Sequence, residues 1–423
     1  MATESSISQT RVRATPEERR ATYVGVILIV LAALVFWAFG LNVMGDLDAT
    51  FNLAFPTDRF PDILWVVNTR ILAFAVAGIL AFLGGLQVRR WNVKRTDLLL
   101  AVGLGFLALA FLAWAAAGKS FSMVGMLRST VILSVPVTLG ALTGLMCERV
   151  AIINIGIEGQ MLASAFAATI LGSAFGLWAG VFGGVMAGAL LGAFLAWLTI
   201  RFLVDQIIAG VVINIFALGL TSFLATRVLA EAQHLNSAPQ FAAIRIPLLA
   251  DIPVLGSMFF NHNIFIYATF LLVVLLHLGF FYTRWGLRSR SVGEHPRAAD
   301  TVGIDVHWTR YRNVILGGMI AGSGGAFLSL TQVSRFEENM TAGIGFIGLA
   351  AMIFGRWRPF GALAAGLVFG FARALQQKLG ILATPIPSEF IGMTPYLVTI
   401  IVVAGVVGRA IPPAADGKPY IKE

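Results

Sequence analysis

Polar side chains are sparse in the middle of this sequence, and one group of them interrupts an apolar stretch. Asn154, Glu158 and Gln160 stand among Ile, Gly, Met and Leu residues. An ionised carboxylate in such surroundings costs about 3 kcal/mol unless other groups satisfy it. In a helix Asn154 and Glu158 would lie on one face, and Gly156 and Gly159 permit a break or a close neighbour. The pattern predicts either a polar clamp between helices or a path for a polar solute.

A second polar group opens and punctuates the apolar run at 206–230. Gln206 and Asn214 are separated by about two helical turns, so their side chains can face the same cavity or helix. Asp205 stands where the helix would begin, and an aspartate there is predicted to cap the helix and to favour its dipole. Amide side chains both donate and accept hydrogen bonds, which suits a neutral, hydroxyl-rich solute.

A third segment, Trp285–Asp305, is mixed in charge and punctuated by Gly293, Pro296 and Gly303. Proline in a first helical turn and glycine past a helix end are typical of a short helix, so one is predicted between Pro296 and Gly303. Composition alone leaves two interpretations, a solvated basic loop and a docking helix for a cytoplasmic partner.

Patterns of catalysis and metal binding are not recognisable in this sequence. The Gly-Lys-Ser run at Gly118–Ser120 has Ala113 where a phosphate-binding loop requires its first glycine. The five histidines are dispersed, no Cys/His cluster has the spacing of a metal site, and Cys147 is the single cysteine. We therefore expect neither an enzyme nor a metal or other cofactor site in this chain.

Apolar runs account for most of the chain. Hydrophobic residues make up 58% and charged residues only 12%, a composition that a water-soluble fold could not bury. The fold class expected is an all-α polytopic membrane protein with about 10 to 12 transmembrane helices, because a run of about 20 residues crosses the hydrocarbon core. The runs lie near 22–42, 66–87, 98–117, 124–146, 158–175, 177–200, 206–230, 263–283, 313–332, 342–355, 359–378 and 395–409.

Two of these runs depart from the pattern of a plain span. The run at 158–175 is preceded by polar residues, and the run at 342–355 is short. Irregular backbone at membrane depth is tolerated only where protein or a water-filled cavity satisfies it. Broken or re-entrant helices are therefore expected in the core.

The distribution of Lys and Arg orients the runs. Most of the 30 basic residues fall in alternate connecting segments, whereas the first outer loop is acidic. Because basic residues near helix ends remain in the cytoplasm, the N- and C-termini are both predicted to be cytoplasmic. The net charge of +9 is therefore a topology signal, and membrane lipid rather than nucleic acid is the expected partner of this surface.

Four regions follow from these patterns: a cytoplasmic polar tail at 1–21, an accessory N-terminal transmembrane bundle at 22–120, a core at 121–411 and a second cytoplasmic tail at 412–423. The core holds nearly all the polar residues of the spans. It also contains glycines at four-residue spacing, which favour close packing of helices inside the chain over dimerisation. These are Gly184, Gly188, Gly192, Gly318, Gly322, Gly366 and Gly370.

Three stretches of the core carry a family resemblance. Residues 148–159, with the sequence ERVAIINIGIEG, and 205–221, with the sequence DQIIAGVVINIFALGLT, resemble ABC-importer permeases of the branched-chain amino acid, ribose and nucleoside family. Residues 286–303 resemble the coupling segment of that family. Nucleoside permeases, often labelled simple-sugar permeases, are the most similar members, and the resemblance covers about 125–410. His295 and Asp205 depart from the usual residues, which are Asn at the first position and a neutral amide or small residue at the second.

The resemblance implies a function and a set of partners. It implies the transmembrane permease subunit of an ATP-driven importer in a bacterial inner membrane, with nucleosides or related ribosyl compounds as solutes. ATP would be bound by a separate ABC ATP-binding subunit, an external substrate-binding lipoprotein would deliver the solute, and a second related permease or a second copy would complete the path. A sugar or branched-chain amino acid importer is the alternative within this class. An ion-gradient-driven secondary transporter, with Glu158 and Asp205 as ion sites, is the alternative from another class.

Two sets of candidate site residues result. The candidates for the substrate path are Asn154, Glu158, Gln160, Gln206 and Asn214. The resemblance implies that the segment 286–303 docks on the ATP-binding subunit. Its candidate coupling residues are Gly286, Arg288, Gly293, Glu294, Pro296, Arg297 and Gly303.

Overall fold

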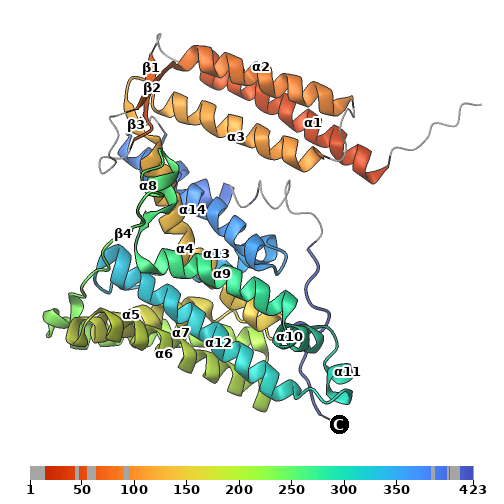
Figure 1. Cartoon of the computed structure of the whole chain (residues 1–423), viewed down its shortest axis with the longest axis vertical. Helices are drawn as coiled ribbons and strands as arrows, with labels where there is room; N and C mark the ends of the chain where they lie inside the picture. The colour runs from red at the N-terminus through yellow and green to blue at the C-terminus, as the bar shows by residue number, and fades with distance from the viewer. Residues whose placement is uncertain are drawn as a thin grey trace, which may run out of the picture. The chain divides into compact units, whose positions relative to one another are not determined.

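A computed structural model describes residues 15–42, 47–54, 63–89, 95–382, 386–397, 400 and 410–422. Helices dominate these residues (Figure 1). By its internal contacts the chain divides into two compact units. The first comprises most residues up to Ser122, and the second comprises most residues from Met123 onward.

The first unit contains three long helices. Helix α1 spans Pro16–Leu34 and continues as the π-helix η1 over Val35–Leu41, α2 spans Thr69–Val88, and α3 spans Thr96–Ala115. Thr15 and Glu18 form a reciprocal capping box at the start of α1, which satisfies backbone N–H groups that the helix cannot. Helices α1 and α2 approach closely, since a Cβ atom on Gly25 would lie 2.8 Å from the carbonyl oxygen of Gly84.

A small sheet accompanies these helices, although sequence analysis predicted only helices. Strand β1, Asp48–Asn52, pairs antiparallel with β2, Leu64–Asn68, and parallel with β3, Ser120–Ser122. The buried ring of Phe51 on β1 lies 5.4 Å from that of Trp65 and 6.0 Å from that of Phe121. Strands this short give too few alternating residues for a periodic signal, and so they are recognisable only from the tertiary structure.

The second unit contains the remaining helices and two short strands. Its first half consists of α4 (Met123–Glu148), α5 (Ile157–Phe175), α6 (Leu177–Ala196) with η3 (Trp197–Arg201), α7 (Gln206–Leu224) with η4 (Ala225–Leu229), η5 (Gln233–Asn236), β4 (Ile244–Arg245), α8 (Leu255–Phe259) and β5 (Asn261–His262). Its second half consists of α9 (Ile264–Tyr282), α10 (Arg284–Glu294), α11 (Pro296–Thr301), α12 (Val306–Phe327) with η6 (Leu328–Val333), α13 (Ile344–Phe354), α14 (Pro359–Ile381) and α15 (Ser388–Gly392).

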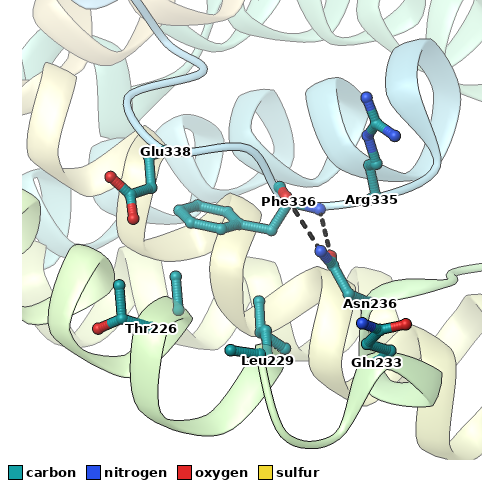
Figure 2. A pocket seen from close by; sticks show the side chains of 9 residues that line it. Thr226, Leu229, Gln233, Asn236, Arg335, Phe336 and Glu338 are labelled. Carbon is teal, nitrogen blue, oxygen red and sulfur yellow. Dashed lines mark hydrogen bonds between the residues drawn. The ribbon is translucent and has the colours of Figure 1, made fainter.

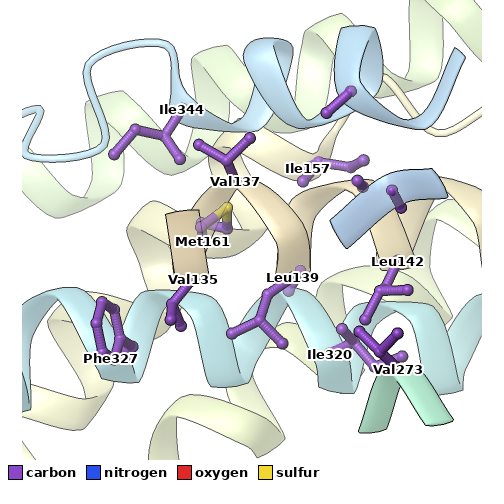
Figure 3. Packing of buried hydrophobic residues seen from close by; sticks show 14 of the residues in the cluster. Val135, Val137, Leu139, Leu142, Ile157, Met161, Val273, Ile320, Phe327 and Ile344 are labelled. Atoms are coloured by element: carbon purple, nitrogen blue, oxygen red, sulfur yellow. The ribbon is translucent and has the colours of Figure 1, made fainter. Parts of the chain in front are cut away.

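Helix α4 lies at the centre of the second unit. It is apolar on all sides and almost entirely buried, as expected for a helix surrounded by other helices. Figure 3 shows Val135, Leu139 and Leu142 of α4 among side chains of the surrounding helices, including Ile320 and Phe327 of α12. This apolar core also includes Ile157 and Met161 of α5, the helix that carries Glu158 and Gln160.

Nine helices within the described ranges are long and apolar enough to cross a membrane. Helix α5 has 19 residues but begins with polar side chains, and α13 has only 11, or about 17 Å at 1.5 Å per residue, which is too short to cross. The expectation of broken helices in the core is thus confirmed. Helix α12 begins at Val306 rather than at 313, and the last expected span, 395–409, lies mostly outside the described residues.

The regularly spaced glycines pack helices inside the second unit, as predicted. A Cβ atom on Gly188 of α6 would overlap the carbonyl oxygen of Gly318 on α12, and one on Gly322 would lie 2.5 Å from the carbonyl oxygen of Gly184. Gly366 and Gly370 of α14 face α4 in the same way. Small residues allow this approach, in which helix backbones touch directly.

Candidate functional site

A break in the backbone between α4 and α5 organises the site. Residues 149–156 are not helical, and Ala151 has a φ of +63°, a conformation that L residues seldom adopt. Backbone polar groups in such a segment need partners outside it. The side chain of Gln206 supplies one, since its Oε1 accepts a hydrogen bond of 2.7 Å from the N–H of Ile153.

Asn214 lies on α7 about two turns after Gln206, and its side chain also forms hydrogen bonds with the region of the break. Its Oδ1 accepts a hydrogen bond of 2.8 Å from the N–H of Gly159, and its Nδ2 donates one of 3.0 Å to the carbonyl of Ile155. Gly159 permits this approach, because a Cβ atom there would lie 2.8 Å from the Cα of Asn214. Gln206 and Asn214 therefore face the same element, as their spacing predicted. Asp205 caps α7 by accepting from two backbone N–H groups, which confirms its predicted local role.

Asn154 in the break and Gln160 near the start of α5 form a hydrogen bond with each other. The Nδ2 of Asn154 donates to the Oε1 of Gln160 over 3.1 Å, and both side chains are fully buried. The sequence analysis expected Asn154 and Glu158 to lie on one face if residues 154–158 were helical. Helix α5 begins at Ile157, so Asn154 lies outside it and does not share a helical face with Glu158. The Oδ1 of Asn154 and the Nε2 of Gln160 lack a hydrogen-bond partner among the described residues.

Glu158 holds the short helix α13 at its N-terminus. Its two carboxylate oxygens each accept a hydrogen bond of 2.7 Å, one from the N–H of Gly343 and one from the N–H of Gly345. A carboxylate at this position satisfies orphan N–H groups and interacts favourably with the helix dipole. The carboxylate of Glu158, which would be costly in an apolar stretch without partners, therefore binds the N-terminus of α13, a helix too short to cross the membrane.

The other end of α13 is tied to the end of α4. The indole Nε1 of Trp357 donates a hydrogen bond of 2.6 Å to the Oε2 of Glu148, and the Nε of Arg149 donates one of 3.1 Å to the carbonyl of Trp357. Sequence analysis missed Trp357, whose partners are about 200 positions away and leave no local signal. Residues on both sides of the break thus hold both ends of α13.

Polar residues of α14 were also missed. Arg373, Gln376 and Gln377 line a hollow of about 390 Å³, to which Gly380 and Ile391 contribute. Nη1 of Arg373 is buried without a hydrogen-bond partner among the described residues. A charged residue inside the apolar run 359–378 was the signal that could have identified this site.

A second hollow, of about 490 Å³, lies where α7 passes through η4 into η5 (Figure 2). Asn236 fixes one wall, since its Oδ1 accepts a hydrogen bond of 2.7 Å from the N–H of Phe336 and its Nδ2 donates one of 3.2 Å to the same residue's carbonyl. Leu229 and the ring of Phe336 provide apolar surface, and Glu338 and Gln233 provide polar groups. This combination of an apolar floor with a few polar groups is typical of small-molecule sites.

The segment 286–303 forms two short helices. Helix α11 begins at Pro296 and ends before Gly303, whose φ is +84°, as the sequence predicted. Helix α10, which the sequence did not predict, is capped by Thr283 and folds back tightly on α9. A Cβ atom on Gly286 would overlap the carbonyl oxygens of Gly279 and Phe280.

These two helices present an exposed face and a buried face. Arg288, Glu294 and Arg297 are exposed, and so are two apolar side chains, Leu287 at 62% and Val302 at 75%. The face therefore offers both charged and apolar groups to a partner protein. The exposed face of α10 and α11 is therefore suited to docking.

The buried face rests directly on the helix break. A Cβ atom on Gly293 would overlap the carbonyl oxygen of Arg149, and Val292 belongs to the same buried apolar cluster as Val150 and Ile152. The structure thus places α10, whose other face is exposed, directly against the break that Gln206 and Asn214 hold.

Comparison with known proteins decides the family. The model of the permease component of branched-chain amino acid transport systems matches residues 126–403. The chain belongs to this permease family. Its first unit precedes the matched region.

Individual relatives resemble the permease over most of its length. It is 40% identical to a guanosine ABC transporter permease protein of Bacillus subtilis over 70% of this chain and 95% of the relative. It is 38% identical to a nucleoside ABC transporter permease protein of Lactococcus lactis over 69% of this chain and 95% of that relative. A putative glucose ABC transporter permease protein of Haloferax volcanii is 32% identical over 60% of this chain and 77% of the relative. No solved structure matches the permease significantly.

Family membership confirms the class of function predicted from the sequence. The chain is a multi-pass membrane permease subunit of an ABC transporter and is not itself an enzyme, because ATP hydrolysis belongs to a separate subunit in such transporters. Within the described ranges, no three side chains of His, Cys, Asp or Glu come together as a metal site would require.

Proposed function

We propose that the permease imports nucleosides or related ribosyl compounds. The relatives named for guanosine and for nucleosides support this solute, since they align with nearly their whole length. The chemistry of the hollows supports it as well. Amide groups of Gln376 and Gln377 in one hollow can exchange hydrogen bonds with ribose hydroxyls. In the other hollow, the ring of Phe336 offers apolar surface to a base.

The packing of α10 on the helix break is the observation that carries the mechanism. An ABC ATP-binding subunit docks on the exposed face of α10 and α11, where Arg288, Glu294 and Arg297 stand beside Leu287. ATP binding and hydrolysis in that subunit move the two helices. The break and α13 follow and change which side of the membrane the path faces, a population shift driven by unequal binding of nucleotide to the two states.

Further partners complete the proposed importer. An external substrate-binding lipoprotein delivers solute, and a second related permease, or a second copy of this chain, encloses the path. The asymmetry of basic residues supports cytoplasmic termini, and the whole resides in a bacterial inner membrane. A glucose-named relative supports one second candidate, a sugar importer with the same mechanism.

Uptake into proteoliposomes tests the proposed solute. The permease is reconstituted with its ATP-binding subunit, its partner permease and the binding lipoprotein, and uptake of labelled guanosine, glucose and leucine is compared with ATP and with a non-hydrolysable analogue. ATP-dependent accumulation of guanosine alone is expected. Preferential accumulation of glucose or leucine would replace the proposed solute, and guanosine uptake driven by an ion gradient without ATP would refute the coupling mechanism.

Removal of exposed charges from the docking face is expected to weaken coupling. A permease that carries both Glu294→Ala and Arg297→Ala is assembled with its ATP-binding subunit. Its substrate-stimulated ATP hydrolysis should fall at least about fivefold, which corresponds to the lower end of typical coupling free energies. Membrane insertion should be intact, because both side chains are exposed. Arg297→Ala alone leaves in place the hydrogen bond that Glu294 accepts from the N–H of Ala414, and it should still lower the stimulation.

A matched pair of changes controls for the loss of surface charge. Arg20 and Asp97 form an exposed ion pair of 2.9 Å in the first unit, and replacing both with Ala should leave stimulated hydrolysis unchanged. Unaltered stimulation in the Glu294 and Arg297 variants would place docking elsewhere on the permease.

A further inference from the structure

Residues 413–420, here named the C-terminal strap, are bound to the end of α10. The N–H of Ala415 donates a hydrogen bond of 3.0 Å to the carbonyl of Gly293, and the N–H of Ala414 donates one of 3.2 Å to the Oε2 of Glu294. Pro413 and Ala415 are buried. A short chain end with few internal contacts is normally poorly ordered unless other elements hold it, and here α10 does so.

The far end of the strap is inserted among α10, α11 and α12. The side chain of Tyr420 is only 6% exposed, and it shares a buried apolar cluster with Val292, Ala299 and Val306, one residue from each helix. The guanidinium of Arg310 lies 5.9 Å from the centre of the Tyr420 ring, and its Nη2 donates a hydrogen bond of 3.4 Å to the carbonyl of Lys418. An aromatic side chain buried among three helices fixes their relative positions through packing.

The middle of the strap touches the helix break. Gly417 has a φ of +73°, and a Cβ atom there would lie 2.9 Å from the Cδ1 of Ile153. The backbone N–H of Ile153 is the group that donates a hydrogen bond to the side chain of Gln206. The strap therefore spans from the helices of the docking face to the segment that α7 holds in the membrane core.

We propose that the C-terminal strap is a positioning element of transport, which makes α10, α11 and the helix break move as one body when the ATP-binding subunit moves the docking face. This proposal rests on the proposed coupling mechanism. Without the strap, α10 meets the break through the close approach of Gly293 to the carbonyl of Arg149 and through the apolar packing of Val292, over both of which a pivoting α10 could slide. The strap adds a hydrogen bond at α10, a buried ring between the helices and a contact at the break, so that pivoting would break all three.

The middle of the strap carries a partly buried carboxyl group, that of Asp416. Its Oδ1 is buried without a hydrogen-bond partner among the described residues. Burial raises the pKa of Asp416 to about 6, although the Glu148 carboxyl, the N–H of Gly417 and the guanidinium of Arg310 act in the opposite direction. Asp416→Asn keeps the size of this side chain, so the strap is expected to remain in place.

The decisive measurement is the amount of solute transported per ATP hydrolysed by the reconstituted complex. With Tyr420→Ala, this ratio should fall at least about fivefold. The ATP-binding subunit should still copurify with the permease, and basal ATP hydrolysis should remain close to the native rate. Tyr420→Phe, which keeps the ring, should restore the native ratio, and Asp416→Asn should not lower it. A chain that ends at Pro412 should behave as Tyr420→Ala does.

A neighbouring residue provides the control for these variants. Ile421 is 64% exposed and lies just beyond the strap, so Ile421→Ala should leave the ratio unchanged. A native ratio in both Tyr420→Ala and the chain ending at Pro412 would overturn the proposal. Loss of the ATP-binding subunit from the Tyr420→Ala complex would also overturn it, because the strap would then shape the docking face rather than transmit its motion.

Failure of the proposed solute remains distinguishable from failure of the strap. If the native complex imports a sugar instead of a nucleoside, the ratio is measured with that sugar, and the comparison among the variants is unaffected. If the native complex shows no ATP-dependent uptake of any solute offered, the proposed function fails before the variants are compared.

Discussion

Replacement of Glu158 by Ala is expected to abolish ATP-driven uptake and to destabilise the permease by roughly 3 kcal/mol or more, since hydrogen bonds to a charged group contribute about 1.5–3 kcal/mol each. The carboxylate accepts from the N–H groups of Gly343 and Gly345, and the change leaves both donors without that partner at the start of α13. Helix α13 would then lose the polar anchor at its N-terminus and keep only its packing on α4 and the hydrogen bonds of Trp357 near its other end. Uptake in proteoliposomes and the thermal unfolding temperature of the purified protein measure the two effects.

Two further variants sharpen this prediction. Glu158→Gln keeps one acceptor oxygen but directs an NH₂ group at a backbone donor, so its loss of stability should be smaller than that of Glu158→Ala but clear. Asp205→Ala removes a carboxylate that caps an exposed helix start and should cost only about 1 kcal/mol. A Glu158→Ala protein with native stability and altered solute preference would instead assign Glu158 to the solute path.

Substitution of Gly188 by Val is expected to prevent α6 and α12 from packing, and little folded permease should be recovered. The Cβ atom of any larger residue would overlap the carbonyl oxygen of Gly318, and a backbone atom cannot turn aside as a flexible side chain can. Overpacking in a core typically costs about 1–3 kcal/mol, and contact with backbone on both sides places this case at or above the upper end. The yield of monodisperse protein and its unfolding temperature report the effect.

Gly219→Val is the matched control for the valine itself. Gly219 also lies in a membrane helix, but a Cβ atom there meets nothing within 4 Å, so only the weaker helix propensity of valine should be felt. If Gly188→Val produced folded single subunits that no longer associate, the glycine stripe would serve dimerisation rather than internal packing. Equal behaviour of the two variants would contradict the close packing of α6 on α12.

Several features of the permease follow from local sequence alone. The apolar runs, the cap at Asp205 and the helix between Pro296 and Gly303 depend on residues within a few positions of one another, and the structure has all three. The spacing of Gln206 and Asn214 also correctly predicted that both side chains face one element. Helical periodicity and capping are short-range properties, which is why a single sequence is enough to indicate them.

Other features were decided only when distant segments packed together. Glu158 and Gln160 showed that the polar stretch after Glu148 needs partners, but the sequence left open whether solute or protein supplies them. The tertiary structure places the N-terminus of α13 against Glu158 and the amide of Asn154 against Gln160. Asn154, Glu158 and Gln160 therefore remain candidates for the solute path, but the hydrogen bonds that they form here hold protein segments together.

The C-terminal tail shows the same division most clearly. Residues 412–423 form a short segment in which two lysines balance two acidic residues, and nothing in their composition indicates that Tyr420 is buried or that Ala415 forms a hydrogen bond with α10. The positions of these contacts are set by the fold of α10, α11 and α12, more than one hundred residues earlier in the chain. Sequence determined that this protein spans a membrane and which polar residues need partners. Only the tertiary structure decided which residues are the partners of these polar side chains, because burial and hydrogen bonding depend on which segments meet in space.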